Sequence, residues 1–199
     1  GWEIKRLGDI LTLIQNGTTA RQNTNHIGYP VSRIETIQQS KFDDNRVRFV
    51  ELTLEDFNKY KYEIGDIAFS HINSFELVGK VAIYNGHPDK LIHGMNLLRL
   101  RVNKQICYPA FLYHFLQSED ARLQLEPKIK RAINQASVNQ QNVKSLEVPL
   151  PPLSEQHHIV ARIEELTRRI EEAKGLRLAA QKETESIMPS ALHEVFSHG

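Results

Sequence analysis

The sequence has a single cysteine, Cys107, among its 199 residues. One thiol excludes an internal disulfide and a zinc site built on several cysteines, which is typical of a reducing compartment. No apolar run approaches the roughly 18 residues that a membrane helix needs, and the first residues lack the basic stretch and apolar core of a signal peptide. We therefore expect a cytoplasmic protein without a membrane partner.

An excess of charge of one sign is also missing. The 25 Lys and Arg residues and 24 Asp and Glu residues leave a net charge of +1, so overall charge gives no argument for nucleic acid. Residues 1–153 carry 19 basic and 16 acidic groups, whereas residues 154–199 carry 6 and 8. Any site for a polyanion therefore lies in the first part of the chain, as a local patch.

Familiar catalytic motifs are absent from the sequence. It contains no glycine-rich dinucleotide or phosphate loop, no Gly-x-Ser-x-Gly nucleophile turn and no His-Glu-x-x-His zinc motif. A metal-dependent nuclease needs an acidic residue followed by an acid-x-Lys unit, but Asp89 and the unit 126–128 lie far apart, and Pro127 interrupts that unit. We expect no catalytic residue, no metal site and no cofactor.

What the first 150 residues do contain is the pattern of an α+β domain. Apolar runs rich in Val, Ile, Phe and Tyr, each bounded by Gly, Pro, Asn or Asp, predict strands. They are 29–37, 66–72, 79–84 and 91–102. Between them the sequence predicts helices over 7–13, over 54–60 with Thr53 as the cap, and from Pro109 to Pro127. With 40% apolar residues, this mixed α/β domain, 1–150, has enough material for a core.

A second part, 151–199, follows a proline-rich connector. Three prolines within residues 149–152 force an extended backbone, after which Ser154 is expected to cap a helix that reaches about residue 186. Pro189 is expected to break this helix, and Ser190 to begin a short last helix. The fold class is therefore α+β, a mixed domain followed by a long helix.

The long helix carries a heptad pattern of apolar residues, which is typical of coiled coils. The positions on the seam are Ile159, Ile163, Leu166, Ile170, Ala173 and Ala180. A single helix cannot bury such a stripe against itself, so it needs another helix. We expect pairing with a partner chain; local packing against the short last helix is the alternative.

Several local strings together resemble the specificity subunits of type I restriction-modification systems. The strongest is the connector 146–156, which reads LEVPLPPLSEQ and is followed by Ile159 and Ile163. Further matching strings are Trp2-Glu3, LGDI at 7–10, GTT at 17–19, GDIAFS at 65–70, GKVAI at 79–83, NLLRL at 96–100 and ALHEVF at 191–196. The resemblance covers essentially the whole chain.

The resemblance implies a target recognition domain that reads double-stranded DNA, followed by a conserved spacer helix. In this family adenine methylation belongs to a separate modification subunit that uses S-adenosylmethionine, and cleavage to a separate ATP-driven restriction subunit, so neither cofactor is expected here. Full-length members carry two recognition domains and two helices, whereas this chain has one of each. The resemblance therefore implies a half-length form that pairs with itself, or with a second half-subunit, to read an interrupted site.

Three polar segments are candidates for DNA contact, because Arg, Asn and Gln can read base edges while Lys, Ser and Thr hold phosphates. The candidates are Thr19, Arg21, Gln22 and Asn23; Ser70, His71, Asn73 and Lys80; and Lys128, Lys130, Arg131, Asn134, Gln135 and Asn139. Our hypothesis is that Lys128, Lys130 and Arg131 contact phosphates. Arg21, Asn134 and Gln135 are the candidates for base reading.

Two other functions remain open on the sequence alone. The heptads and the weak net charge would suffice for a coiled-coil interaction adaptor that does not bind DNA. A small metal-dependent nuclease is the other alternative, and cleavage of DNA by the isolated chain would reveal it.

Overall fold

The computed structural model describes residues 1–133 and 135–197, with the side chains of 186 and 188–195 left aside. Its helices are α1 Leu7–Ile10, α2 Leu54–Tyr60, α3 Pro109–Leu116, α4 Glu119–Leu125, α5 Gln140–Lys144 and α6 Leu153–Ser197, with short 3-10 helices η1 Ile34–Ile37, η2 Asp44–Arg46 and η3 Glu126–Lys128. Its strands are β1 Glu3–Arg6, β2 Leu11–Asn16, β3 Gln22–Asn23, β4 Tyr29–Ser32, β5 Arg48–Val50, β6 Ile67–Ser70, β7 Ile72–Asn73, β8 Val81–Ile83, β9 Ile92–His93, β10 Leu97–Val102, β11 Lys130–Ala132, β12 Gln135–Ser137 and β13 Glu147–Leu150. The α+β class predicted from the sequence is confirmed.

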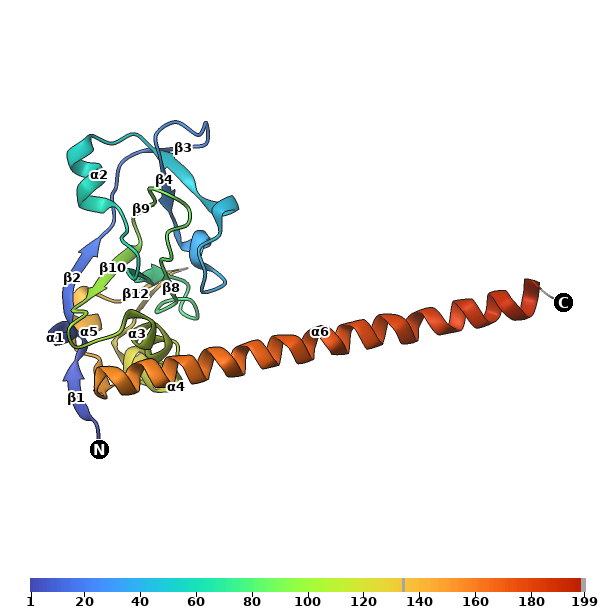
Figure 1. The fold of residues 1–199 in the computed structure, drawn as a ribbon. Coiled ribbons are helices and arrows are strands. Elements are labelled where there is room, and N and C mark those ends of the chain that lie inside the picture. Colours follow the sequence, from blue (N-terminus) through green and yellow to red (C-terminus); the bar gives the residue numbers. More distant parts are fainter. Residues whose placement is uncertain (134, 198–199) are drawn as a thin grey trace. The chain divides into compact units, whose positions relative to one another are not determined.

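By its contacts the chain divides into two compact units, Gly1–His157 and His158–Gly199. The first unit contains four small sheets, with strand orders β1-β13, β2-β10-β6-β8, β11-β12-β7 and β3-β5-β4-β9. All pairs are antiparallel except β4 with β9. In Figure 1, β3, β4, β9 and α2 gather at one end of this unit, and β1, α1, α3 and α5 at the other.

Strand β10 is the centre of the first unit. It pairs with β2 on one side and with β6 on the other, and Leu97, Leu98 and Leu100 are completely buried. A strand covered on both faces is apolar at most positions, and the two exceptions in β10, Arg99 and Arg101, both lie close to Asp66. This is why the segment 91–102 is recognisable in the sequence as a strand region, which the structure divides into β9 and β10.

The other predicted strand segments are partly confirmed. The segment 66–72 contains β6 and the first residue of β7, and 79–84 contains β8. The segment 29–37 forms β4 but then turns into η1, where the Thr36 hydroxyl accepts from the backbone N–H of Arg33 at 2.9 Å. This local side-chain bond offers the backbone an alternative to the sheet, which explains why the strand stops at Ser32.

Among the helices, α2 has the predicted bounds and its predicted cap, because the Thr53 hydroxyl accepts from the N–H of Asp56 at 3.1 Å. The helix predicted over 7–13 is wrong: α1 ends at Ile10, and the following residues form β2, whose backbone pairs with β10. The helix from Pro109 is divided into α3 and α4, because Ser118 caps a new helix by accepting from the N–H of Ala121.

The connector after residue 146 is extended, as the prolines predict, and its strand β13 pairs with β1. Helix α6 begins at Leu153, two residues before the first helical position that a cap at Ser154 would give. The carbonyl of Pro152 accepts from the N–H groups of Glu155 and Gln156, at 2.9 and 3.0 Å. Ser154 is therefore inside the first turn, and the prediction that it caps the helix is wrong.

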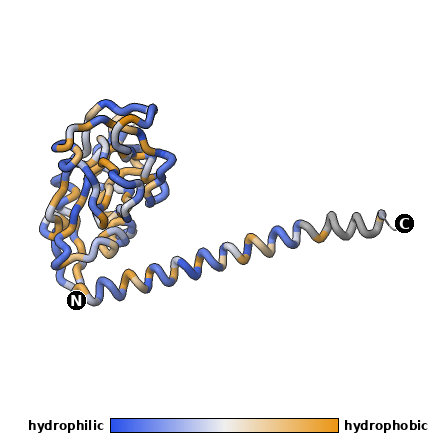
Figure 2. The backbone as a smooth tube through the Cα atoms, turned by 45° about the horizontal axis from the view of Figure 1, so that its top comes forward, coloured by the Kyte–Doolittle hydropathy of each residue, from blue (hydrophilic) through white to orange (hydrophobic). Residues whose placement is uncertain are grey.

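The second unit consists of the remainder of α6. The helix runs without interruption to Ser197, so the break predicted at Pro189 and the separate last helix are wrong. Proline removes one N–H from the helical ladder, but helices on both sides of a proline can remain continuous. Figure 2 shows that α6 is mostly hydrophilic, with apolar residues recurring along it. No helix among the described residues is long and apolar enough to cross a membrane.

Candidate nucleic-acid interface

A polar hollow lies on the sheet formed by β3, β5, β4 and β9. Its lining contains three arginines and four amide or hydroxyl side chains. The lining residues are Arg21, Gln22, Asn23, Thr24, Asn25, Arg33, Arg48 and Glu51. Three of the four candidates of the first predicted segment are thus brought together here, and Thr19 lines a neighbouring hollow that also contains Arg21 and Gln22.

The arginines of this hollow differ in their partners. Arg33 forms an ion pair with Glu35 at 3.1 Å. No described acidic side chain forms an ion pair with Arg21, which is exposed, or with Arg48, which is half-buried. Neither of these two guanidinium groups is within ion-pair distance of a described carboxylate, although Glu51 lines the same hollow. A hollow with three arginines and one carboxylate is suited to an anionic ligand.

The sequence-based reasoning missed Arg33 and Arg48. Arg48 lies in β5, which pairs with β3 and β4, so pairing across the sheet brings it into the same hollow as Arg21. The alternation of basic and apolar residues in 46–50, RVRFV, is the local signal that could have indicated a strand with a basic face.

Asn23, by contrast, supports the loop that follows β3. Its side-chain oxygen accepts from the N–H of Asn25 at 3.0 Å, and its amide nitrogen donates to the carbonyl of Ile27 at 2.9 Å. Both ends of the amide are therefore engaged within the loop. Gln22, next to it, has no such bond among the described residues and lines both hollows.

The third predicted segment forms a β-hairpin of β11 and β12. Lys130, Arg131 and Gln135 are all exposed on it, as are Ala132 and Ile133. Lys128 lies just before the hairpin, where its ammonium group donates to the carbonyl of Gln124 at 2.9 Å. Asn134 lies outside the described residues. The predicted basic segment therefore forms one hairpin, on which Lys130 and Arg131 are both exposed.

The base of the hairpin is held against the turn that contains Phe75. The guanidinium of Arg131 lies 3.6 Å from the centroid of the Phe75 ring, and that of Arg122 lies 5.0 Å from it. Arg122 in turn donates to the carbonyls of Phe75 and Val78, at 3.1 and 2.8 Å. Stacking of an arginine on an aromatic ring restricts the guanidinium without neutralising its charge.

Several candidates turn out to be structural. Ser70 is completely buried, and its hydroxyl accepts from the amide of Asn73 at 3.0 Å, so the prediction that Ser70 contacts DNA is wrong. Asn73 also accepts from the N–H of Ser74, and Asn139 caps α5 by accepting from the N–H of Asn142. Turn and cap positions favour short polar side chains for these bonds, which is why composition alone cannot separate the two roles.

His71 connects the hairpin sheet with the hollows. The backbone N–H of His71 donates to the carbonyl of Asn96 at 3.2 Å. Its backbone carbonyl accepts from the N–H of Val138, just after β12, at 2.9 Å. Asn96 lines the hollow that contains Thr19 and Arg21. Burial lowers the pKa of His71. Lys80 lies behind this region, where its carbonyl accepts from the N–H of Ser70, and lines a different pocket. The backbone of His71 thus links the segment after β12 with Asn96, which lines the second hollow.

The sequence of residues 1–179 matches the family described as the type I restriction modification DNA specificity domain. The chain belongs to this family. It is 52% identical over 159 residues to a protein of Methanocaldococcus jannaschii named as the MjaX type I restriction enzyme specificity subunit, a match that covers 79% of this chain and 37% of that protein. It is 31% identical to the EcoKI specificity subunit of Escherichia coli strain K12, covering 79% of this chain and 34% of that one.

A solved structure supports the same relationship. The HsdS subunit from Thermoanaerobacter tengcongensis superimposes with a TM-score of 0.74 at 27% identity, over 98% of this chain and 49% of that chain. The specificity-domain chain therefore spans about a third to a half of the length of these relatives. The resemblance to the family that the sequence strings carry is confirmed.

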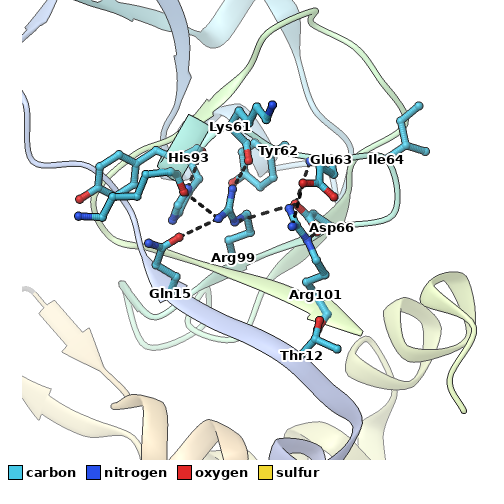
Figure 3. A network of polar contacts seen from close by, with 12 residues as sticks. Thr12, Gln15, Lys61, Tyr62, Glu63, Ile64, Asp66, His93, Arg99 and Arg101 are labelled. Atoms are coloured by element: carbon cyan, nitrogen blue, oxygen red, sulfur yellow. Dashed lines mark hydrogen bonds and ion pairs between the residues drawn. The ribbon is translucent and has the colours of Figure 1, made fainter. Parts of the chain in front are cut away.

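Behind the hollows, the specificity domain contains a buried polar network around Arg99 of β10 (Figure 3). Arg99 is only 4% exposed; it donates to the carbonyls of Lys59 and Lys61 and to the side chain of Gln15, and its Nε lies 3.9 Å from Asp66. Asp66 also accepts two bonds of 2.7 Å from Arg101. A buried arginine with this many acceptors fixes the loop after α2 onto the central sheet.

His93 lies beside this network at the end of β9. Its ring nitrogens face the carbonyls of Tyr60 and Asn16, at 2.8 and 2.9 Å. Burial, together with the nearby Arg99 charge, lowers the pKa of His93 to about 4, so the ring is neutral at physiological pH and donates to one of the two carbonyls. His93 therefore joins α2, β2 and β9 beneath the candidate interface.

Proposed function

We propose that this chain is a DNA-reading part of a type I restriction-modification system, in which residues 1–150 form the target recognition domain. The observations that support the proposal are the arginine-lined hollows and the exposed basic hairpin, which the backbone of His71 links. Arg21, Arg48, Lys130 and Arg131 supply positive charge, and none of them forms an ion pair with a described carboxylate, although Glu76 is within electrostatic range of Arg131. A local basic surface of this kind is what phosphate contact requires in a protein of nearly zero net charge.

The roles of the side chains follow from their chemistry. Lys130 and Arg131 contact phosphates, since they project from a ribbon, and Lys128 supports them from the preceding turn. Arg21, Gln22 and Gln135 read base edges, because a guanidinium or amide can form two bonds with one base. Arg48, which the sequence-based hypothesis omitted, joins the base-reading set from the same hollow as Arg21.

The chain directs chemistry that separate subunits perform. We propose that a modification subunit methylates adenine and a restriction subunit cleaves, and that this chain contributes no catalytic residue and binds neither of their cofactors. Among the described residues, no group of three His, Cys, Asp or Glu side chains is placed to hold a metal ion. Such a complex acts on the DNA of its own cell, so we propose a cytoplasmic location.

Residues 151–199 form the spacer and pairing element. Along α6 the seam residues Leu166 and Ile170 are 43% and 53% exposed, and Ile159 and Ile163 are half-buried. Apolar residues at heptad spacing are stabilised by packing into a second helix. We propose that this helix pairs with α6 of a second copy or of a second half-subunit, which would place two recognition domains on an interrupted site.

Sedimentation equilibrium tests the pairing directly. The wild-type chain should sediment as a dimer at micromolar concentration, and Leu166→Glu together with Ile170→Glu should give a monomer, because two charges would enter the seam. The matched control, Leu176→Glu, changes an exposed leucine outside the seam and should leave the dimer intact. A wild-type monomer, alone and with the modification subunit, would contradict pairing of identical chains.

DNA reading is tested by the reconstituted complex of this chain with its modification subunit. Fragments of the host genome are mixed with the complex, and bound fragments are recovered at 50 and 200 mM salt and sequenced. Enrichment of one short interrupted motif at both salt concentrations supports the proposal. Uniform recovery of all fragments, from a complex that demonstrably assembles, would contradict it and favour an interaction adaptor.

A further inference from the structure

The tip of the β11–β12 hairpin carries a large apolar residue that the fold does not use. Ile133 is 93% exposed, the highest value among the described large apolar side chains that lie on the surface. By register, Ala132 pairs with Gln135, so Ile133 directly follows the last paired residue of β11. Short connections between strands favour Asn, Asp and Gly, and a β-branched residue gains nothing from turn chemistry there.

The hairpin below Ile133 is firmly attached to the domain. Ala136 of β12 is 2% exposed, and β12 also pairs with β7. Arg131 opposes Ala136 across the hairpin and stacks on Phe75 at 3.6 Å. Both strands of the hairpin are therefore attached to the domain, so the domain sets the direction in which Ile133 projects.

Positive charge flanks the tip on both sides of the ribbon. Successive side chains of a strand point to opposite faces, so Lys130 and Arg131 lie on opposite faces of β11. Both are exposed, and neither forms an ion pair with a described acidic side chain. The Arg131 face is turned toward the domain, because Ala136 opposite Arg131 is 2% exposed and Arg131 stacks on Phe75, so Lys130 lies on the free face. An exposed cation beside an apolar tip is complementary to a groove that has phosphates along its wall and base edges at its floor.

The major groove of DNA has these properties and is wide enough. It is about 12 Å wide, admits a two-stranded β-ribbon, and presents one apolar group at its floor, the C5-methyl group of thymine. We propose that the β11–β12 hairpin enters the major groove of the target and that Ile133 reads a thymine through contact with its methyl group. This inference rests on the proposed function and adds to it an apolar base-reading residue that the polar candidates do not include.

The assignment explains why an isoleucine occupies the turn. Contact with a methyl group removes apolar surface of both partners from water, and it discriminates thymine from cytosine, which has no methyl group. Lys130 and Arg131 meanwhile hold phosphates, which positions the hairpin without reading sequence. The tip and the stem therefore have separable effects, one on specificity and one on overall affinity.

The test uses the complex with the modification subunit and a duplex containing the recognised site. Because the modified base is an adenine, each such site contains at least one thymine opposite it. Ile133→Ala should weaken binding to this duplex by about fiftyfold, an estimate from the loss of three buried carbon atoms, and leave the salt dependence and the binding of unrelated duplex unchanged. The matched control is Leu123→Ala, since Leu123 is also exposed, at 63%, but lies on α4.

A scan of the thymines in the site then identifies the contact. Each thymine is replaced in turn by deoxyuridine, which lacks only the methyl group. One replacement should weaken the wild-type complex and have no further effect on Ile133→Ala. If Ile133→Ala behaves like Leu123→Ala, or if no deoxyuridine distinguishes it from the wild type, the inference is wrong while the proposed function stands. A wild-type complex with no sequence preference overturns both.

Discussion

The guanidinium of Arg131 stacks on the ring of Phe75, with 3.6 Å between the guanidinium carbon and the ring centroid. Phe75 belongs to the turn after β7, whereas Arg131 belongs to β11, so the contact fastens a basic hairpin to a separate segment of the domain. Arg122 also holds the backbone of this turn, because it donates to the carbonyl of Phe75. The cation of the hairpin is therefore held in place before any DNA arrives.

This contact makes a prediction that separates positioning from charge. Phe75→Leu should reduce affinity of the complex for its site about threefold to tenfold, because the stack is lost, but leave the slope of log affinity against log salt unchanged. Arg131→Ala should reduce both affinity and the slope, the slope by about one unit. Fluorescence anisotropy at several salt concentrations measures both. Equal slopes for Arg131→Ala and the wild type would show that Arg131 does not contact phosphate.

Arg21 should behave differently from the hairpin cations. Arg21→Ala should lower affinity for the recognised site by about 1 to 3 kcal/mol and relax the preference at one base position, because a base contact is lost. Lys130→Ala should weaken binding to all sequences alike. Selection of bound sequences from a randomised duplex pool distinguishes these outcomes. An unchanged motif for Arg21→Ala would remove Arg21 from the base-reading set.

The connector that leads into α6 depends on Gln156. This side chain is completely buried; it accepts from the N–H of Tyr108 at 2.7 Å and donates to the carbonyls of Ile106 and Pro151, at 2.9 and 2.8 Å. Gln156→Leu leaves these three backbone groups unpaired and should lower the free energy of unfolding by about 2 to 4 kcal/mol.

Chemical denaturation monitored by circular dichroism checks this value for Gln156→Leu. Gln141→Leu is the matched control, because Gln141 is exposed on α5, and it should change the unfolding free energy by no more than about 0.5 kcal/mol. If both variants unfold at the same denaturant concentration, the three hydrogen bonds of Gln156 contribute nothing to stability.

Buried His93 predicts a pH dependence of stability. Its pKa is about 4 in the folded chain and near 6.5 when unfolded, so between these values the unfolded state binds more protons. The contribution of neutral His93 is fully present above pH 6.5 and is lost as the pH falls toward 4, to a total of about 3 kcal/mol. His93→Gln should show a shallower decline of unfolding free energy over pH 6.5 to 4. A decline as steep as that of the wild type would contradict this origin.

Local signals in the sequence predicted the elements that local forces determine. Helix α2 follows from its Thr53 cap, and the extended connector follows from its prolines. The segment 7–13 has helical spacing, but its second half becomes β2 because it pairs with β10, almost 90 residues away. Pairing between segments so far apart depends on the packing of the whole core, so the residues of one short segment do not reveal it.

In the candidate interface too, local sequence signals predicted some residues, and long-range pairing determined the others. Exposed cations on one continuous segment, Lys130 and Arg131, were predictable from composition. Arg48 was not, because only the pairing of β5 with β3 brings it into the same hollow as Arg21. Ser70 was chosen for its residue type, yet it is a completely buried strand residue whose hydroxyl bonds to Asn73. Residue type indicates what a side chain can bind, and the fold decides whether anything can reach it.

The measurement that tests the central claim most directly is genome-wide mapping of methylated adenines. Cells that express the modification subunit with this chain are compared with cells that express the modification subunit alone. The account predicts a new interrupted motif that depends on the chain, palindromic if two identical copies pair, and weakened by Lys130→Ala with Arg131→Ala. An unchanged set of methylated adenines, with the complex shown to assemble in those cells, would contradict DNA reading by this chain.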